Sequence, residues 1–124
     1  MALLHNDIYD YGLDGLAGPN RVLHILSQEP ATLGDVPTYT LGQKIAPTIG
    51  SPVDRTGGGR EVIITAVADG NVSDTGTATH WAIVDATEGT ERLLAANNLS
   101  LSQGVTDGTA FTLTEFTVGM PAPI

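Results

Sequence analysis

Cysteine is absent from this chain of 124 residues, and basic and aromatic residues are scarce. Without cysteine the chain can form neither a disulfide nor a thiolate metal site, which fits folding in a reducing cytoplasm. Five Lys and Arg stand against fourteen Asp and Glu, so the formal net charge is −9. Because nucleic-acid affinity comes mainly from neutralising phosphates with Lys and Arg, we expect no nucleic-acid partner. An acidic surface suits solubility, or docking onto a basic patch of another protein.

Long hydrophobic runs are also missing. No stretch approaches the ~18 apolar residues that a membrane-spanning helix needs, so we expect no membrane partner. The first residues, Met1–Asp7, lack the basic start and the long apolar run of a secretion signal. The length suits one domain, which should bury roughly two thirds of the surface that its unfolded chain exposes.

The stretch Gly76–Ser100 organises the chain. Its first part, Gly76–Asp85, is rich in Thr, Trp, Ile and Val, which favour a strand. Ala86–Gly89 predicts a tight turn, and a second strand is expected from Glu91 to the pair Asn97-Asn98. The stretch contains Trp81, the only tryptophan, and we expect the core to pack around it.

Four further segments predict strands. Arg21–Ser27 is a compact apolar run, and Glu61–Ala68 is apolar on both faces, so both of its faces should be covered. Leu99–Thr106 is a weaker candidate. Thr109–Val118 is the last strand, and its apolar residues change from one face to the other partway along. A bulge near Thr114-Glu115 would explain that change.

Turn signals divide these strands. Asp69–Asn71 and Asp107-Gly108 predict hairpin turns, and Ser51–Arg60, with three consecutive glycines, predicts a flexible loop. Gly34–Pro37 is expected to break any regular element. Between these breaks two short strands are expected, Thr38–Leu41 and Lys44–Ile49.

An N-terminal helix is expected over Leu4–Ala17. Leu4, Ile8 and Tyr11 recur at helical spacing, and Gly18-Pro19 is a plausible stop. Because a helix this short is marginal alone, it needs a surface to lie on, either its own domain or a partner.

Together these patterns predict a mainly β fold: an antiparallel β-sandwich or barrel of immunoglobulin-like size, with a short N-terminal helix or arm. We expect one domain over residues 1–124. Residues 1–19 form the arm or helix, residues 20–60 are irregular with short strands, and residues 61–124 form a regular antiparallel core.

No catalytic, cofactor or metal residues are expected. The three histidines have no nearby second ligand for zinc, and Asp69–Asp74 lacks the later Gly and bidentate Glu of a calcium loop. Ser73, His80 and Asp85 could form a triad only by chance, since no nucleophile elbow frames a serine. Gly57–Arg60 lacks the Gly-Lys-Ser/Thr ending of a phosphate loop.

Two segments, DGNVSDTGTATHWAIVD and RLLAANNLSLSQGVTDGTAFTLTEFTVGMP, resemble a family of small tailed-bacteriophage virion structural proteins. The opening segments DIYDYGLDGL and HILSQEPAT are similar to that family too. The resemblance implies a capsid decoration, or cement, protein on the outside of the head, assembled in the host cytoplasm. Its implied partners are the major capsid protein and other copies of itself, with no cofactor.

Contacts with such a partner are expected from the N-terminal segment and the glycine-rich loop. An alternative is a head-fibre or tail component that acts as a host-surface or carbohydrate-binding β-module, with an exposed aromatic in a polar groove. A small hydrolase is the third hypothesis, and it ranks well behind the other two. The residues assigned to partner binding are Leu4, Ile8, Tyr11, Leu13, Arg55 and Arg60.

Overall fold

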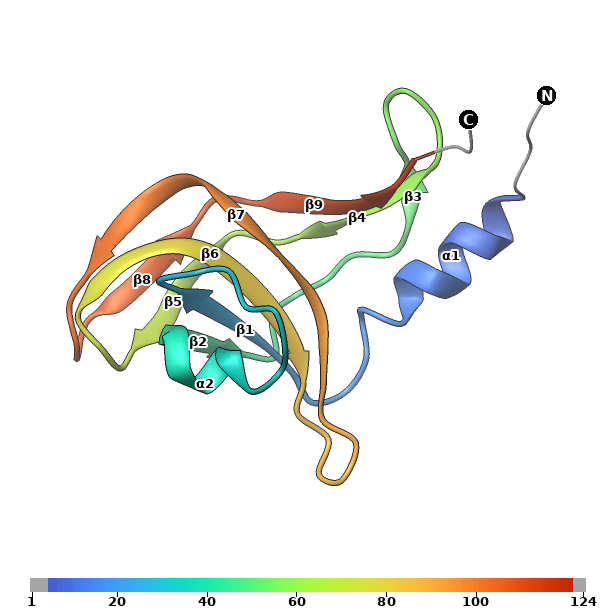
Figure 1. The fold of residues 1–124 in the computed structure, drawn as a ribbon. Helices are drawn as coiled ribbons and strands as arrows, with labels where there is room; N and C mark the ends of the chain where they lie inside the picture. Colours follow the sequence, from blue (N-terminus) through green and yellow to red (C-terminus); the bar gives the residue numbers. More distant parts are fainter. Residues whose placement is uncertain (1–4, 122–124) are drawn as a thin grey trace.

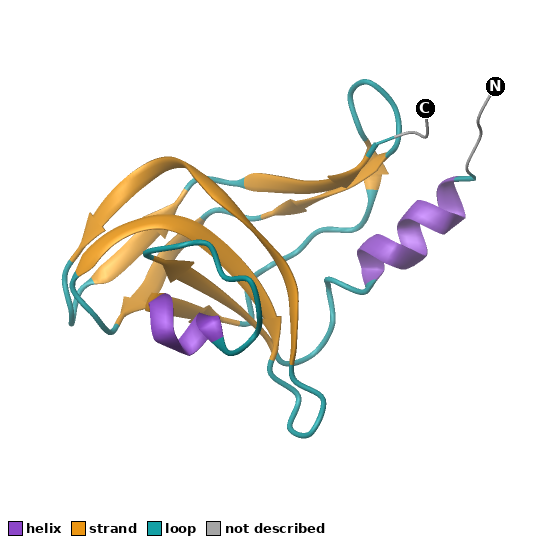
Figure 2. Ribbon diagram, in the orientation of Figure 1, coloured by secondary structure: helices purple, strands orange, loops and turns teal. Residues whose placement is uncertain are grey.

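The computed structural model describes residues 5–121, and of residues 6–9 it describes the backbone alone. Figure 2 shows a molecule made mostly of strands, with its two helices at the periphery. In chain order the elements are α1 (Asn6–Asp14), β1 (Arg21–Leu26), α2 (Asp35–Tyr39), β2 (Thr40–Ile45), β3 (Val53–Asp54), β4 (Arg60–Ile64), β5 (Val67–Val72), β6 (Gly76–Asp85), β7 (Arg92–Val105), β8 (Ala110–Leu113) and β9 (Phe116–Met120).

The strands form two antiparallel sheets, which confirms the predicted mainly β fold. A curled six-stranded sheet has the order β7-β6-β1-β2-β5-β8, and a three-stranded sheet has the order β3-β4-β9 (Figure 1). Strand β1, from the part of the chain that was expected to be irregular, lies in the middle of the larger sheet, between β2 and β6. The larger sheet ends in two free edges, on β7 and on β8.

The β6–β7 hairpin is the longest pairing. β6 has the predicted bounds, whereas β7 unites the two separate strands that were predicted after the turn. Ala78 pairs with Gln103 and His80 pairs with Asn98, so four residues of β7, 99–102, stand against Thr79 alone. This bulge curls the hairpin and pushes residues 99–102 away from β6.

The predicted irregularity at Thr114-Glu115 is present, and it is larger than a bulge. β8 ends at Leu113 as a partner of β5, and β9 begins at Phe116 as a partner of β4. The chain therefore leaves one sheet and enters the other across these two residues. A change of sheet explains why the apolar residues change face here.

The main core lies between the two sheets and α1. Trp81 belongs to it as predicted: its side chain is 6% exposed, and its ring lies 4.6 Å from the ring of Phe116, centroid to centroid. Leu13 and Leu16 bring α1 and its C-terminal extension into the same cluster. A smaller cluster around Val36 packs on the outer face of the large sheet, under α2.

Two predictions between β1 and β2 were wrong. Gly34–Pro37 does not break the chain but begins α2, and the strand predicted over Thr38–Leu41 starts only at Thr40. Pro37 is tolerated because it lies in the first helical turn, where a backbone N–H has no intrahelical acceptor. The carboxylate of Asp35 accepts the backbone N–H groups of residues 31 and 32, at 2.9 and 3.2 Å, and so fixes the turn that leads into the helix.

Later boundaries also differ from the predictions. Glu61–Ala68 is not one strand, because β4 and β5 belong to different sheets. Asp69–Asn71 is not a turn but part of β5, whereas the turn at Asp107-Gly108 is confirmed, with Gly108 at a φ of 85°. Lys44–Ile49 is not a strand either: β2 ends at Ile45, and Ile49 forms one isolated bridge to β4.

Arg21 joins the end of α1 to the large sheet. Its guanidinium donates to the carbonyls of Gly15, Leu16 and Pro19, at 2.8, 3.1 and 2.9 Å, and lies 3.1 Å from the carboxylate of Asp85. These hydrogen bonds fix the segment that follows α1 and so hold the helix against the large sheet. Within residues 5–121 no helix is long and apolar enough to cross a membrane.

Candidate functional site

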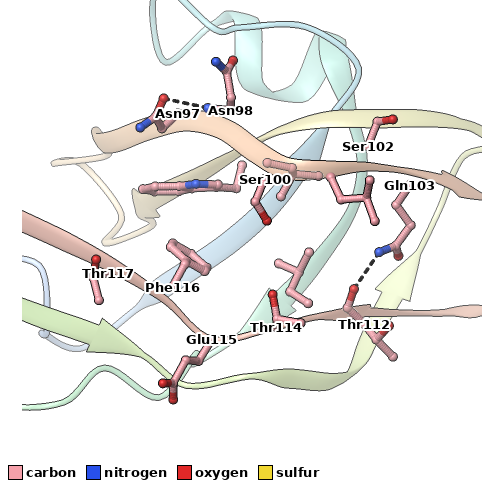
Figure 3. Close-up of a pocket in the computed structure, with 14 residues that line it drawn as sticks. Asn97, Asn98, Ser100, Ser102, Gln103, Thr112, Thr114, Glu115, Phe116 and Thr117 are labelled. Carbon is pink, nitrogen blue, oxygen red and sulfur yellow. Dashed lines mark hydrogen bonds between the residues drawn. The ribbon is translucent and has the colours of Figure 1, made fainter.

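A wide hollow lies where the six-stranded sheet fails to close. Its volume is about 880 Å³, and two stretches line it: residues 97–103 of β7, and residues 112–117, which run from β8 into β9. Figure 3 shows Ser100 and Phe116 pointing into the space from opposite sides. We call this groove the seam, because it separates the two edge strands of one sheet.

The floor of the seam is apolar. Trp81 and Phe116 meet there, with Leu99 and Leu113 beside them. Leu101, at the crest of the β7 bulge, is 81% exposed and lies on the rim. A large apolar side chain so exposed beside an apolar floor is typical of a surface that another molecule covers.

The rim of the seam is polar and almost uncharged. Among the lining residues of the described chain Glu115 is the single charged one. Hydroxyl and amide side chains offer hydrogen-bond donors and acceptors without the desolvation cost of full charges. These neutral polar residues are Asn97, Asn98, Ser100, Ser102, Gln103, Thr112, Thr114 and Thr117.

One hydrogen bond crosses the seam. The side-chain amide of Gln103 donates to the backbone carbonyl of Thr112 at 2.8 Å (Figure 3). It closes the seam at one end, while the part between residues 97–102 and residues 113–117 stays open. Among residues 5–121, no backbone hydrogen bond joins β7 to β8.

A second hollow, of about 490 Å³, lies between α2 and the outer face of the large sheet. His24 lines it, with its Nδ1 atom 2.9 Å from the hydroxyl of Thr40. Burial lowers the pKa of His24, so this imidazole stays neutral near pH 7. Glu91 also lines the hollow, and it forms no ion pair with the described residues.

Side chains that could support hydrolysis do not converge. His80 and Asp85 stand five positions apart along β6, which places them on opposite faces of the strand. Asp85 contacts Arg21 and Arg92, and its pKa is held well below the usual range, chiefly by the hydroxyl hydrogen bond from Thr87. Within residues 5–121 no group of three His, Cys, Asp or Glu side chains could hold a metal ion.

The residues predicted for partner binding in the N-terminal segment have different environments. Leu4 lies outside the described residues, and Ile8 is described only through its backbone, within α1. Tyr11 is 76% exposed, as a contact residue would be. Leu13 is 3% exposed and packs in the main core, so its side chain serves the fold.

The two predicted arginines also differ. Arg60 donates to the carboxylates of Asp10, at 2.9 Å, and Asp54, at 2.8 Å, and these hydrogen bonds raise its pKa. It therefore fastens α1 to the hairpin that carries the glycine-rich loop. Arg55 donates to the carbonyl of Gly58 at 3.2 Å within that loop, and among residues 5–121 it is the one cation without a carboxylate partner.

Comparisons with protein-family models, with curated proteins and with solved structures find no match to this chain.

The seam was not anticipated from the sequence. Most of its residues come from β7 and from the stretch in which β8 leads into β9, and β7 and β8 are adjacent in the sequence yet lie at opposite ends of the strand order. Two local signals point toward it: the uncharged, proline-free run Asn97–Gln103, and the change of face at Thr114-Glu115. The change of face was interpreted as a bulge within one strand, the run at 97–103 was divided between two predicted strands, and only the strand order brings the two stretches together.

Proposed function

We propose that this chain is a non-enzymatic structural protein of a phage virion, bound to the outside of the capsid shell as a decoration protein. The observation that carries the proposal is the seam, a wide groove between two strand edges that lack backbone partners within the described chain. Such edges are ready to pair with another polypeptide. The segments that resemble phage virion proteins form most of the walls of this groove.

The distribution of charge supports docking onto a basic protein surface. Four of the five basic side chains are engaged with carboxylates of the chain itself, which leaves the excess of acidic groups to solvent or to a partner. An acidic exterior also disfavours contact with packaged nucleic acid. Binding that occurs only on the assembled shell stabilises the assembled state by mass action. The basic members of these pairs are Arg21, Lys44, Arg60 and Arg92.

The test is the composition of purified virions of the phage that encodes this chain. Quantitative mass spectrometry should find the chain at a copy number comparable with that of the major capsid protein. Virions stripped of the chain should then lose thermal and osmotic resistance, and regain it when the purified protein is added back. Absence of the chain from virions overturns the proposal, as does unchanged resistance after stripping.

A fibre or tail component that binds host-surface glycans is the second candidate. The aromatic floor beneath a neutral polar rim favours it, since aromatic rings and amide or hydroxyl groups suit sugars. A copy number far below that of the major capsid protein, together with binding to an oligosaccharide array, would support this candidate over decoration.

A further inference from the structure

The two edges of the seam belong to one sheet that almost closes on itself. Every pairing in the order β7-β6-β1-β2-β5-β8 is antiparallel, so β7 and β8 run in opposite directions. They approach closely enough for Gln103 to reach the backbone of Thr112. Beyond that bond, the hollow separates residues 97–102 of β7 from residues 113–117, which lead from the end of β8 into β9.

The backbone of β7 is especially short of partners at residues 99–102. These four residues stand against Thr79 alone, so their N–H and C=O groups cannot all pair with β6. The opposite side of the same stretch faces the hollow. Unpaired backbone groups next to an apolar floor are costly unless water or another chain satisfies them.

Both edges also have few of the groups that usually prevent strand addition. Exposed edges are commonly protected by Lys, Pro or inward-pointing charges. Asn97–Gln103 contains neither proline nor a charged residue, and Thr112–Thr117 contains only Glu115. The bulge in β7 is the one protective feature, and it displaces backbone toward the hollow.

We propose that the seam is a strand-insertion site, in which an extended segment of the shell protein pairs with the free edge of β7 and lies against residues 113–117, which lead from β8 into β9. The proposal rests on the proposed function for the identity of the partner. Addition of a strand to free edges is a known mode of peptide recognition.

The size of the hollow sets the length of the inserted segment. A strand residue occupies ~160 Å³, from a rise of ~3.3 Å, a strand spacing of ~4.8 Å and a sheet spacing of ~10 Å. A hollow of about 880 Å³ therefore holds about five residues. This length matches the open part of β7, which ends where Gln103 closes the seam.

The lining defines the chemistry of the segment. Alternate side chains face the aromatic and leucine floor, so they are apolar or small, while the others contact the amide and hydroxyl rim. Glu115 is the single charged lining residue and the chain carries a net charge of −9, so the segment is free of acidic residues and carries a basic residue near Glu115.

A peptide fits this groove better than a glycan does. Sugars stack on open aromatic faces, whereas Trp81 is 6% exposed and its ring packs against Phe116. The backbone N–H and C=O groups that lack partners at the seam lie along the bulged stretch of β7, residues 99–102, and an extended peptide can match them in register.

Hydrogen exchange of the full chain, free and bound to shells stripped of it, tests strand insertion directly. Binding should slow the exchange of backbone amides in residues 97–103 and residues 112–117 together. Residues 35–45, which form α2 and β2 away from the seam, serve as the internal control and should be unchanged. Binding without protection of both edge segments overturns the proposal.

A charge-matched pair of variants supplies a second test. Ser100→Lys with Thr114→Lys places two cations on opposite walls of the seam, and should weaken binding to shells by about tenfold or more, equivalent to about 1.4 kcal/mol. Thr65→Lys with Ser73→Lys adds the same charge at exposed positions outside the seam and should leave affinity unchanged. Circular dichroism and thermal melting confirm that both variants fold. Equal affinities of the two double variants contradict the proposal.

If the protein does not bind shells at all, the proposed function fails and the seam is tested with a second probe. Synthetic peptides that tile the other virion proteins are then screened against the full chain, again with hydrogen exchange as the readout. A peptide without acidic residues that protects both edges upholds strand insertion. If no peptide protects both edges, or if an oligosaccharide binds and the seam variant abolishes that binding, strand insertion is wrong.

Discussion

At the scale of single residues, Gly70 shows how a missing side chain positions a large one. It lies within β5, opposite Phe111 of β8, and a β-carbon at this position would overlap the Phe111 ring. The ring is 1% exposed and covers the backbone of Gly70, which holds β8 against β5. The absence of a side chain here is a requirement of packing, since the residue lies in a strand and not in a turn.

Gly70→Ala should therefore destabilise the protein by about 1–3 kcal/mol, the usual cost of overpacking a core. Urea denaturation followed by tryptophan fluorescence measures the change. Gly104→Ala is the matched control: Gly104 also lies in a strand, its added β-carbon would meet no atom within 4 Å, and the change should be neutral or slightly stabilising. Equal destabilisation by the two changes would contradict this account.

The sequence predicted some of these residue roles well. Trp81 is in the core as expected, because a large aromatic side chain within an apolar strand is most stable when it is buried. Leu13 was assigned to a partner surface, but it is buried, since a short helix can turn its apolar face to its own domain. Gly70 was interpreted as part of a turn because Asp-Gly-Asn is a strong local turn signal. Packing with Phe111, forty-one positions later, overrides that signal.

At the scale of elements, Asp85 links three strands and the end of α1. It ends β6, pairs with Arg21 of β1 and with Arg92 of β7, and accepts hydrogen bonds from the backbone and hydroxyl of Thr87. Because Arg21 binds the carbonyls of residues 15, 16 and 19, the position of α1 depends on the same carboxylate. Loss of the Asp85 charge should therefore weaken the packing of β1, β6, β7 and α1 together.

The pH dependence of stability follows from the depressed pKa of Asp85, which lies below its ordinary value of 3.8. The native state keeps this group ionised at a pH where the unfolded chain protonates it. Its contribution to stability is therefore complete above the ordinary carboxyl pKa and is lost as the pH falls below it. Asp85→Asn should lower the melting temperature at pH 7 and flatten the acid part of the stability curve.

The matched control for this prediction is Asp74→Asn. Asp74 is exposed and its carboxylate contacts no other described residue, so the variant should retain the wild-type melting temperature at pH 7 and the wild-type acid dependence. Thermal melts between pH 7 and pH 2 compare the three proteins. An Asp85→Asn variant with an unchanged acid dependence would show that the ion pairs do not couple folding to pH.

Elements with strong local patterns were predicted more accurately than elements that depend on distant contacts. β6 follows from a stretch rich in Thr, Trp, Ile and Val and β1 from a compact apolar run, and the change of face at Thr114-Glu115 revealed a real break. α2 was missed because five residues cannot display a helical period. The break between β4 and β5 was missed because it follows from their membership of different sheets. The seam could not be predicted for the same reason, because local sequence patterns do not determine the order of strands in a sheet.

At the scale of the whole molecule, the excess of negative charge governs how the protein meets a partner. Most cations are engaged in internal ion pairs, so the acidic groups dominate the long-range field. A field of one sign attracts an oppositely charged surface from a distance and accelerates association by about 10- to 10³-fold. This effect concerns the rate of encounter more than the final affinity.

Association with stripped shells should accordingly slow as salt is added. The Debye length falls from about 30 Å at 0.01 M to about 8 Å at 0.15 M ionic strength, and an electrostatically steered rate should fall by several-fold over that range. Stopped-flow light scattering measures the rate. A variant with two exposed acids neutralised, Glu29→Gln with Asp107→Asn, should show a weaker salt dependence. A rate that is insensitive to salt would show that steering does not operate.

The change of sheet between β8 and β9 also determines when, during synthesis of the chain, the smaller sheet can be completed. β4 is the central strand of its sheet, and its partner β9 exists only when residues 116–120 have been made, at least fifty-two positions after Ile64. At roughly 5–20 residues per second, the ribosome needs about 3–10 s to produce the missing strand. Until then Val62 and Ile64, both fully buried in the finished protein, have no β9 beside them. We therefore expect the nascent chain to be prone to aggregation until β9 emerges, because apolar side chains that β9 later covers are exposed before then.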